Sequence, residues 1–363
     1  MSVKYSAKNE RIKREYFDFL KEAKQQDEQS IDAVAKALAR FDEYIRFKEF
    51  RNFHRQQAIG FKRKLADQVS DATGEKLSKS TLHSTCRHLK NFFQWLSMQA
   101  GYKSTVKFSD ADYFNISAKD SRVARATRPK RVPTIEEITT LVNAMPSSTP
   151  FELRDRALIA FTLLTGLRDA ATASLKIKHV DFDKDEVFQD AREVNTKAGK
   201  TIITLFFPVD DLFRKIVLDW VEYLREELNF DDNAPLFPKT RSHLSCNSEA
   251  SASILIPEHW ANATPIRKAF RRGFEGIDLP YANPHSFRNT LAKLGEELCK
   301  NAEDFKAWSQ NLGHESVLTT FYSYGEVQPE RQAQIIQRLK EPDTMMFNNA
   351  DEIAKAVVKA MEK

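Results

Sequence analysis

The sequence predicts a mainly helical protein with a small antiparallel sheet, an α+β fold in two domains. Apolar residues recur at intervals of three and four along most of the chain, which is typical of amphipathic helices. Residues 178–208 instead alternate between polar and apolar, as strands do. The length of 363 residues exceeds what one hydrophobic core usually organises. We therefore place domains at residues 1–115 and 134–340, a linker at 116–133 and a tail at 341–363.

Four helices are predicted in the first domain, at residues 9–25, 31–48, 54–70 and 79–100. The second and fourth carry the clearest apolar stripes. These stripes consist of Ile31, Val34, Leu38, Phe41 and Ile45, and of Leu82, Cys86, Leu89, Phe93 and Leu96. Because each stripe must be buried against another element, we expect a small helical bundle, with Ser78 or Ser80 capping the fourth helix.

The first third of the chain is strongly basic. Residues 1–132 contain 28 Lys and Arg against 16 Asp and Glu, a formal charge of +12 within a total of +5. Such an excess attracts polyanions, so we expect a nucleic acid as the partner, with a merely solvated basic surface as the alternative. The candidate DNA contacts lie on the third and fourth helices and in the linker: Arg55, Lys62, Arg63, Lys64, His83, Arg87, Lys90, Arg122, Arg125, Arg128, Lys130 and Arg131.

The linker is predicted from its prolines and its charge. Pro129 and Pro133 oppose helix, apolar periodicity is absent, and five Arg or Lys follow Asp120. Immediately afterwards, Thr134 and Glu137 have the spacing of a capping box, which predicts the first helix of the second domain.

The second domain is predicted to contain a buried helix at residues 152–168, too apolar for an exposed position, which ends near Gly166 and places Arg168 at the edge of the core. Residues 178–208 predict a hairpin in which 193–197 and 200–207 pair, with Lys197 beside the turn. Helix is expected again at 210–228, and a polar surface loop at 239–257.

Several side chains suited to attack on a phosphodiester occur in the second domain. Cleavage without a metal requires cationic donors on the nonbridging oxygens, a general acid for the leaving group and a nucleophile that conserves the bond energy. Arg168 and Arg288 fit the first requirement, because a guanidinium matches phosphate oxygens bidentately. The remaining candidates are His285 as a base or phosphate contact, His314 as a donor, Lys197 as the acid, and a tyrosine, Tyr324 or Tyr322, as the nucleophile.

These residues resemble the signature of the tyrosine recombinases of the phage-integrase class. The matching motifs are Thr165-Gly-Leu-Arg168, Lys197 near a turn, His285-Ser-Phe-Arg288, Leu312-Gly-His314 and a following tyrosine. The resemblance covers residues 134–330, and over the first domain it concerns architecture only. It implies a site-specific recombinase that acts on double-stranded DNA and forms a 3′-phosphotyrosine and a Holliday junction, with no metal or other cofactor. It also implies a dimer on each DNA site and a tetramer on two, with accessory proteins left open.

The chain departs from the family pattern at two positions. The family usually has an acidic residue three positions after the first arginine, where this chain has Ala171; Asp169 is adjacent but would point elsewhere on a helix. The nucleophile usually lies nine residues after the second histidine, where this chain has Ser323. We favour Tyr324, because Val327 follows it at the usual spacing and a loop absorbs one inserted residue, and Tyr322 is the alternative.

The tail is predicted to end in a short amphipathic helix at residues 350–363, which needs a surface to dock on. That surface is a neighbouring protomer, as the resemblance implies, or the chain's own domain.

No membrane-spanning stretch or secretory signal is evident, so we expect a cytoplasmic, nucleoid-associated protein. Three scattered cysteines suggest neither disulfides nor a zinc site. A relaxing topoisomerase of the related tyrosine type and a catalytically silent DNA-binding protein remain alternatives, and the DNA target and the kind of element served stay open.

Overall fold

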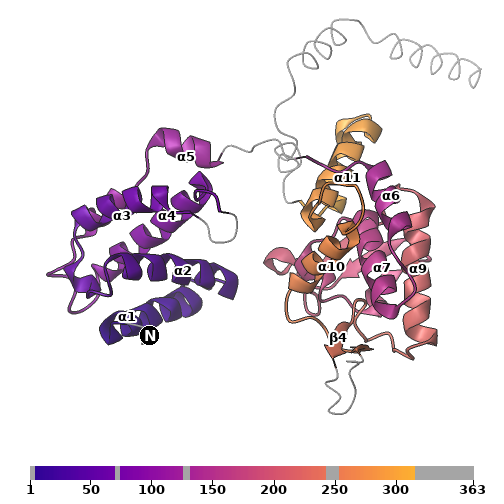
Figure 1. Cartoon of the computed structure of the whole chain (residues 1–363), viewed down its shortest axis with the longest axis horizontal. Helices are drawn as coiled ribbons and strands as arrows, with labels where there is room; N and C mark the ends of the chain where they lie inside the picture. Colours follow the sequence, from indigo (N-terminus) through magenta and orange to yellow (C-terminus); the bar gives the residue numbers. More distant parts are fainter. Residues whose placement is uncertain (1–4, 70–73, 126–130, 243–252, 315–363) are drawn as a thin grey trace, which may run out of the picture. The chain divides into compact units, whose positions relative to one another are not determined.

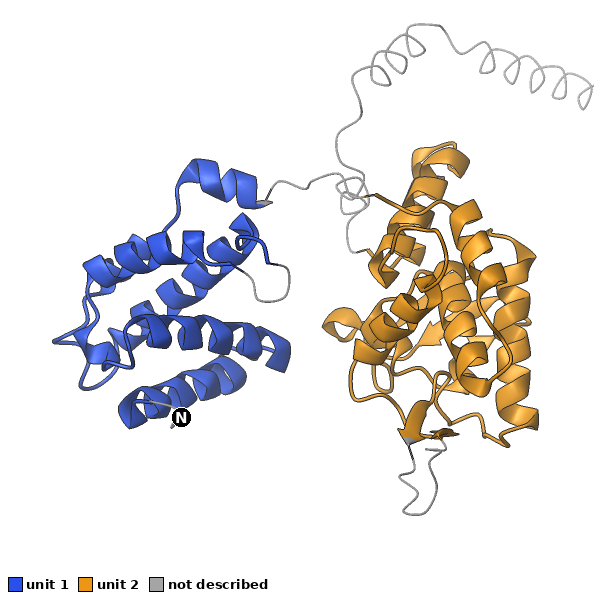
Figure 2. Ribbon diagram, in the orientation of Figure 1, with its two compact units in different colours: residues 1–128 blue, residues 129–363 orange. Residues whose placement is uncertain are grey.

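The computed structural model describes residues 5–69, 74–125, 131–242 and 253–314. The chain forms two compact units, residues 1–128 and 129–363, which are coloured separately in Figure 2. Among the described residues, no helix is long and apolar enough to cross a membrane.

The first unit is helical, and all four predicted helices are present (Figure 1). Its helices are α1 (Ala7–Asp18), α2 (Glu28–Tyr44), α3 (Arg55–Asp67), α4 (Lys79–Leu96) and α5 (Ala118–Arg125). A π-helical turn, Phe19–Ala23, extends α1, and a 3-10 helix, Phe108–Phe114, follows α4. Ser78 caps α4, because its side chain accepts a hydrogen bond from the backbone N–H of Thr81.

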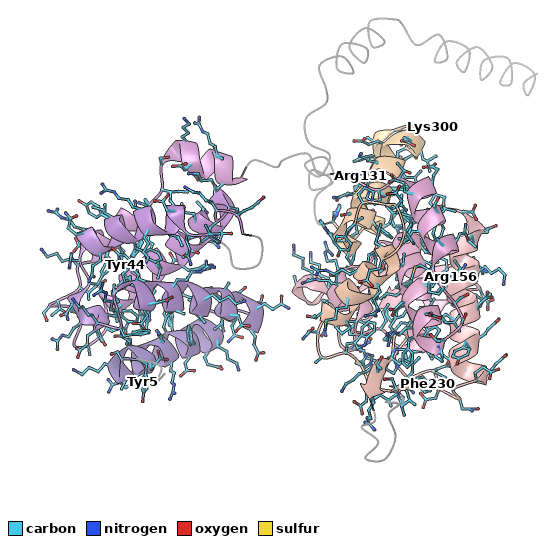
Figure 3. The ribbon with its side chains drawn as sticks, viewed as in Figure 1. Tyr5, Tyr44, Arg131, Arg156, Phe230 and Lys300 are labelled. Carbon is cyan, nitrogen blue, oxygen red and sulfur yellow. The ribbon has the colours of Figure 1, made fainter. Side chains whose placement is uncertain are left out.

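An aromatic cluster forms the core of the first unit. The fully buried ring of Phe41 packs edge-on against Phe61 and Phe93, each with a centroid separation of 5.2 Å. Tyr44, labelled in Figure 3, packs against the same Phe61 from the next turn of α2. This cluster joins α2, α3 and α4 into the small bundle that the apolar stripes predict.

Helix α5 lies inside the segment predicted as a linker, so the expectation of no helix at residues 116–133 is wrong for 118–125. The side chain of Ser117 accepts a hydrogen bond from the backbone N–H of Asp120 and so begins the helix. Asp120 also forms an ion pair of 3.0 Å with Lys79, and α5 packs against α4. The N-terminal capping pattern at Ser117 was the signal for this helix.

The second unit surrounds a buried central helix, α7 (Figure 1). Its helices are α6 (Ile135–Ala144), α7 (Pro150–Thr165), α8 (Asp169–Thr172), α9 (Asp211–Glu226), α10 (Thr264–Phe274), α11 (Pro284–Leu298) and α12 (Ala302–Asn311). Helices α6, α9, α10 and α11 all pack on α7. The capping box predicted at Thr134 and Glu137 is present at the start of α6.

Two small antiparallel sheets complete the second unit. The first contains β1 (Val180–Asp181), β2 (Glu186–Gln189) and β3 (Ile202–Leu205) in that order, with Phe188 opposite Ile203. The second pairs β4 (Lys239–Ser242) with β5 (Ser253–Ile256). The prediction of a loop throughout 239–257 is therefore wrong at both ends, because β4 pairs with β5 although its own sequence, Lys-Thr-Arg-Ser, has no apolar alternation.

Candidate active site

Gly166, which has a left-handed backbone conformation, ends the helix that precedes the first candidate arginine, Arg168. Helix α7 ends at Gly166, which has φ = 60°, a conformation that favours glycine. A Cβ atom at this position would lie 2.8 Å from Cδ1 of Leu291 and 3.1 Å from Cδ2 of Leu312. The turn is thus packed directly against α11 and the end of α12. Arg168 then leaves the core as the N-cap residue of α8, as predicted.

Arg288 lies in the second turn of α11, where it is 5% exposed. Its Nη1 donates to the carbonyl oxygen of Gly166, and its Nη2 donates to that of Leu312 at 2.6 Å. The same Nη2 lies 3.2 Å from Nε2 of His314. One guanidinium therefore connects three segments that are far apart in the sequence.

Arg168 reaches the same loop as Arg288. Its Nη2 donates to the carbonyl oxygen of Gly313 at 3.4 Å. Ala171, where the family usually has an acidic residue, is buried in the core of the unit. Asp169 forms an ion pair of 3.3 Å with Arg267 of α10, so the acidic residue nearest to Arg168 in sequence helps to join α8 to α10.

Burial and crowded positive charge shift the pKa values of this site. Burial, followed by the charge of Arg168, lowers the pKa of Arg288 to about 9. Burial and then the charges of Arg288 and Arg168 lower the pKa of His314 to about 4, so this imidazole is neutral at neutral pH. Since a guanidinium can only donate, Nε2 of His314 accepts from Arg288, and the ring proton must be on Nδ1. The neutral ring is then a hydrogen-bond donor through Nδ1.

His285 and Lys197 lie at the exposed side of the same site. His285 is exposed in the first turn of α11, and Lys197 is exposed in a 3-10 turn, Lys197–Gly199. Electrostatic interaction with each of them lowers the pKa of His314, after burial and the two arginines. The structure therefore brings together the five predicted catalytic residues that it describes.

The surroundings of Lys197 differ from the predicted hairpin. The partner of β3 is β2, with Glu186 opposite Leu205, and not residues 193–197. Residues 190–200 form a series of turns, because Val194 is buried and its backbone N–H donates to the carbonyl of Asp190 at 2.7 Å. Lys197 is nevertheless beside a turn between two paired strands.

Asn311 fixes the loop that holds both arginines, and the sequence did not single it out. Its side-chain Oδ1 accepts from the backbone N–H of Leu205 at 2.7 Å, and its Nδ2 donates to the carbonyl of the same residue at 2.9 Å. The amide thus pairs with the edge of β3 as a short strand would. A small hollow lies between this loop and the sheet, and it is lined by Thr165, Gly166, Leu167, Arg168, Gln189, Ile202, Thr204, Arg288, Asn311, Leu312 and Gly313.

Two candidate DNA contacts of the first unit also hold its structure together. Nζ of Lys62 donates to the carbonyl of Asn115 at 2.7 Å, and Nζ of Lys90 donates to the side chain of the same residue at 3.0 Å. His83, Arg87 and Lys90 line a hollow of about 530 Å³ beside α5.

The predicted basic residues also differ in exposure and in whether the structure describes them. The side chains exposed on the surface are Arg55, Arg63, Lys64, Arg87, Arg122 and Arg131. Arg131 forms an ion pair with Glu137. Arg125 ends α5, whereas Arg128 and Lys130 lie outside the described residues, as do Tyr322, Tyr324 and the predicted tail helix.

Comparisons with known proteins agree with the fold and the motifs. The phage integrase family matches residues 131–331. The tyrosine recombinase XerC of Lactobacillus delbrueckii subsp. bulgaricus is 25% identical over 258 residues, 69% of this chain and 73% of that protein. The tyrosine recombinase XerD of Vibrio vulnificus is 25% identical over 268 residues, 73% of this chain and 74% of that protein.

Solved structures share the architecture. A lambda integrase dimer bound to a COC′ core site matches with a TM-score of 0.58 and 11% identity, covering 88% of this chain and 96% of that chain. The XerH site-specific recombinase bound to difH substrate matches with a TM-score of 0.56 and 16% identity, covering 93% and 86%. The predicted fold class, mainly helical with a small antiparallel sheet, is confirmed.

Proposed function

This chain belongs to the phage integrase family of tyrosine recombinases, enzymes that cut and join DNA, and on that premise we propose that it carries out site-specific recombination through a covalent 3′-phosphotyrosine. One observation carries the proposal. Arg168 and Arg288, from two separate segments, both donate to backbone carbonyls of the loop 312–314, and Nη2 of Arg288 also lies 3.2 Å from Nε2 of His314 in that loop. This arrangement suits a single phosphate group.

In the proposed reaction, the phenol oxygen of Tyr324 attacks the phosphorus of the scissile phosphodiester. The bond from phosphorus to the 5′ oxygen breaks, and Lys197 gives its proton to that leaving oxygen. His285 takes the proton of the phenol or contacts the phosphate. Arg168, Arg288 and the Nδ1 proton of His314 stabilise the charge that develops on the nonbridging oxygens. In rejoining, the 5′ hydroxyl of a partner strand attacks the phosphotyrosine and the phenol recovers its proton.

We assign residues 1–115 as a core-binding domain, which binds DNA jointly with the segment 116–133. Residues 134–340 are the catalytic domain. The basic side chains of α3 and α4 support this assignment by charge. The lambda integrase neighbour is a dimer bound to a core site, which supports a dimer on each DNA site. A tetramer on two sites with a Holliday junction, and a tail from residue 341 that docks on a neighbouring protomer, complete the proposal.

The first experiment captures the covalent intermediate without knowledge of the target. Sheared genomic DNA from the source cell is incubated with the protein, and adducts are recovered by precipitation with potassium dodecyl sulfate and sequenced. We expect one recurring sequence. Recovery of no covalent adduct above that of Arg288→Lys would contradict the proposal, because a lysine cannot reproduce the forked contacts of Arg288.

The second experiment assigns the nucleophile on a nicked duplex that carries the recovered sequence. Tyr324→Phe should abolish the adduct and Tyr322→Phe should retain it; the reverse result would make Tyr322 the nucleophile. Strand transfer should proceed in EDTA without ATP, because the phosphotyrosine stores the energy of the broken bond. Relaxation of a plasmid that lacks the recovered sequence would instead favour a topoisomerase.

A further inference from the structure

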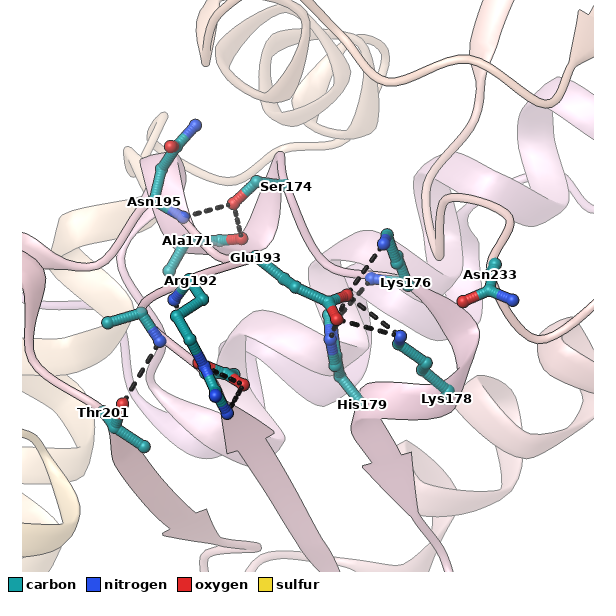
Figure 4. Close-up of polar contacts among 12 residues, drawn as sticks. Ala171, Ser174, Lys176, Lys178, His179, Arg192, Glu193, Asn195, Thr201 and Asn233 are labelled. Atoms are coloured by element: carbon teal, nitrogen blue, oxygen red, sulfur yellow. Dashed lines mark hydrogen bonds and ion pairs between the residues drawn. The ribbon is translucent and has the colours of Figure 1, made fainter.

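The turn that carries Lys197 directly follows Glu193 and Asn195, whose polar contacts are drawn in Figure 4. Lys197 itself is exposed, and Ala198 and Gly199 beyond it both have positive φ, so the turn needs support from elsewhere. Two contacts supply it, one through the side chain of Glu193 and one through the backbone of Asn195.

Glu193 lies at the centre of three basic groups. Nζ of Lys176 donates to its carboxylate at 2.7 Å and Nζ of Lys178 at 3.1 Å, while Nε2 of His179 is 3.5 Å away. The backbone N–H of Lys176 donates to Nδ1 of His179, so in the neutral ring the proton is on Nε2 and faces Glu193. The bonds from the two lysines lower the pKa of Glu193 to about 2. This carboxylate therefore ties the turns at 190–200 to the segment just before β1.

Ser174 makes the second contact. Its Oγ accepts from the backbone N–H of Asn195 at 2.8 Å, and its hydroxyl proton lies in reach of the carbonyls of Ala171 at 3.0 Å and Ala170 at 3.1 Å. Both carbonyls belong to α8, the helix that begins immediately after Arg168. A continuous path of bonds thus leads from the turn of Lys197 to the helix of Arg168, through the position at which the family usually has an acidic residue.

We propose that Glu193 and Ser174 are positioning residues that set the ammonium group of Lys197 against the phosphate held by Arg168. The inference rests on the proposed function, in which Lys197 protonates the leaving 5′ oxygen. Neither residue needs to touch DNA. The side chain of Glu193 is 34% exposed and its ion pairs contribute little to global stability, so their loss should disturb the turn more than the fold.

The chemistry of the leaving group separates positioning from general damage. A duplex is synthesised with the recovered cleavage sequence and with sulfur in place of the 5′ bridging oxygen at the scissile phosphate. A thiol has a pKa of about 8.5, so the thiolate leaves without a proton. An alkoxide resembles hydroxide, whose conjugate acid has a pKa of about 15.7, and it requires the general acid. A defect confined to the delivery of this proton must therefore disappear on the sulfur duplex.

The variants are Glu193→Gln and Ser174→Ala, with Lys197→Ala as the reference for loss of the acid. We expect both to slow adduct formation on the oxygen duplex by about 10- to 100-fold, as misplacement of a catalytic group does. On the sulfur duplex all three should react within a few-fold of the wild type. Ser174→Thr, which keeps the hydroxyl, should restore the rate on the oxygen duplex. Glu258→Gln is the matched control, because Glu258 also forms ion pairs with two basic side chains. These are Lys239 and Arg241, which belong to β4 and not to the turns around Lys197.

Suppose that Lys197→Ala is slow only on the oxygen duplex. The positioning role is then wrong if Glu193→Gln and Ser174→Ala lose the same rate on both duplexes, or if they keep the wild-type rate on the oxygen duplex. If Lys197→Ala is equally slow on both duplexes, the assignment of Lys197 as the acid is wrong. If the wild type forms no adduct on either duplex, the proposed function itself fails. The three failures are therefore distinguishable.

Discussion

His314 should remain neutral in acid that protonates an ordinary histidine. At pH 5 an imidazole with the usual pKa of about 6.5 is about 97% protonated, whereas one with a pKa of about 4 is about 10% protonated. The physical reasons are partial burial first and then the charge of Arg288, whose Nη2 lies 3.2 Å from Nε2 of His314. Protonation would remove the acceptor of that bond and would place two cations against each other.

Titration of ¹³C-labelled histidine rings by NMR measures this directly. The resonance that is missing in His314→Asn identifies the residue, and we expect its midpoint near 4. Arg168→Gln should raise the midpoint, because the charge of Arg168 contributes to the low pKa. A midpoint at or above 6.5, or no response to Arg168→Gln, would refute the reasoning.

The same shift predicts how stability depends on pH. The pKa of His314 is lower in the folded than in the unfolded chain, so its contribution to stability is present above about pH 6.5 and is lost as the pH falls towards 4. The full shift corresponds to about 3 kcal/mol, and partial exposure reduces the expected effect to about 1 kcal/mol at pH 5. His314→Asn should gain this amount relative to the wild type between pH 8 and pH 5. If the free energy of unfolding of His314→Asn differs from that of the wild type by the same amount at pH 8 and at pH 5, the prediction is wrong.

Two predictions concern the fold. Gly166→Ala should destabilise the second unit by about 3 kcal/mol, since both the positive φ and a leucine carbon 2.8 Å from the new Cβ oppose it. Gly199→Ala shares the positive φ but meets no atom within 4 Å and should cost about 1 kcal/mol; equal losses in thermal denaturation would contradict the packing argument. Asp42→Ala should destabilise the first unit by about 3 kcal/mol, because it removes the buried carboxylate that accepts from Lys13 at 2.6 Å and from Asn9 at 2.8 Å, and leaves Lys13 only its more exposed partner Glu10. The exposed carboxylate of Asp67 provides the control, and its replacement by Ala should cost less than about 1 kcal/mol by the same measurement.

The helices were predictable because the spacing of apolar side chains along the sequence shows which face of each helix is buried. Leu38, Phe41 and Phe93 lie on single stripes, and all three are completely buried in the aromatic core of the first unit. The end of the central helix was predictable for a similar reason, since Gly166 tolerates the left-handed turn that few other residues adopt.

The turns around Lys197 were not predictable in this way. The alternation of Glu193, Val194 and Asn195 is the pattern of a strand, but here it places one buried side chain between a carboxylate that binds lysines and a backbone N–H that binds Ser174. Periodicity reports which side chains are buried and not whether the backbone pairs with a neighbour. The carbonyl partners of the two site arginines, at Gly166, Leu312 and Gly313, were invisible for a related reason, because they belong to the backbone.

Those carbonyls explain how the site concentrates positive charge. A carboxylate partner would orient a guanidinium but would also cancel its charge, whereas the carbonyls of Gly166 and Leu312 orient Arg288 as dipoles without net charge. The charge of Arg288 is therefore retained for a phosphate, and burial strengthens its effect on whatever binds there. The low pKa values of His314 and Arg288 result first from burial and then from this arrangement, because each added positive charge disfavours the next. A bound phosphate should reverse this effect and raise both pKa values, so the dianionic transition state is the species that the site stabilises most.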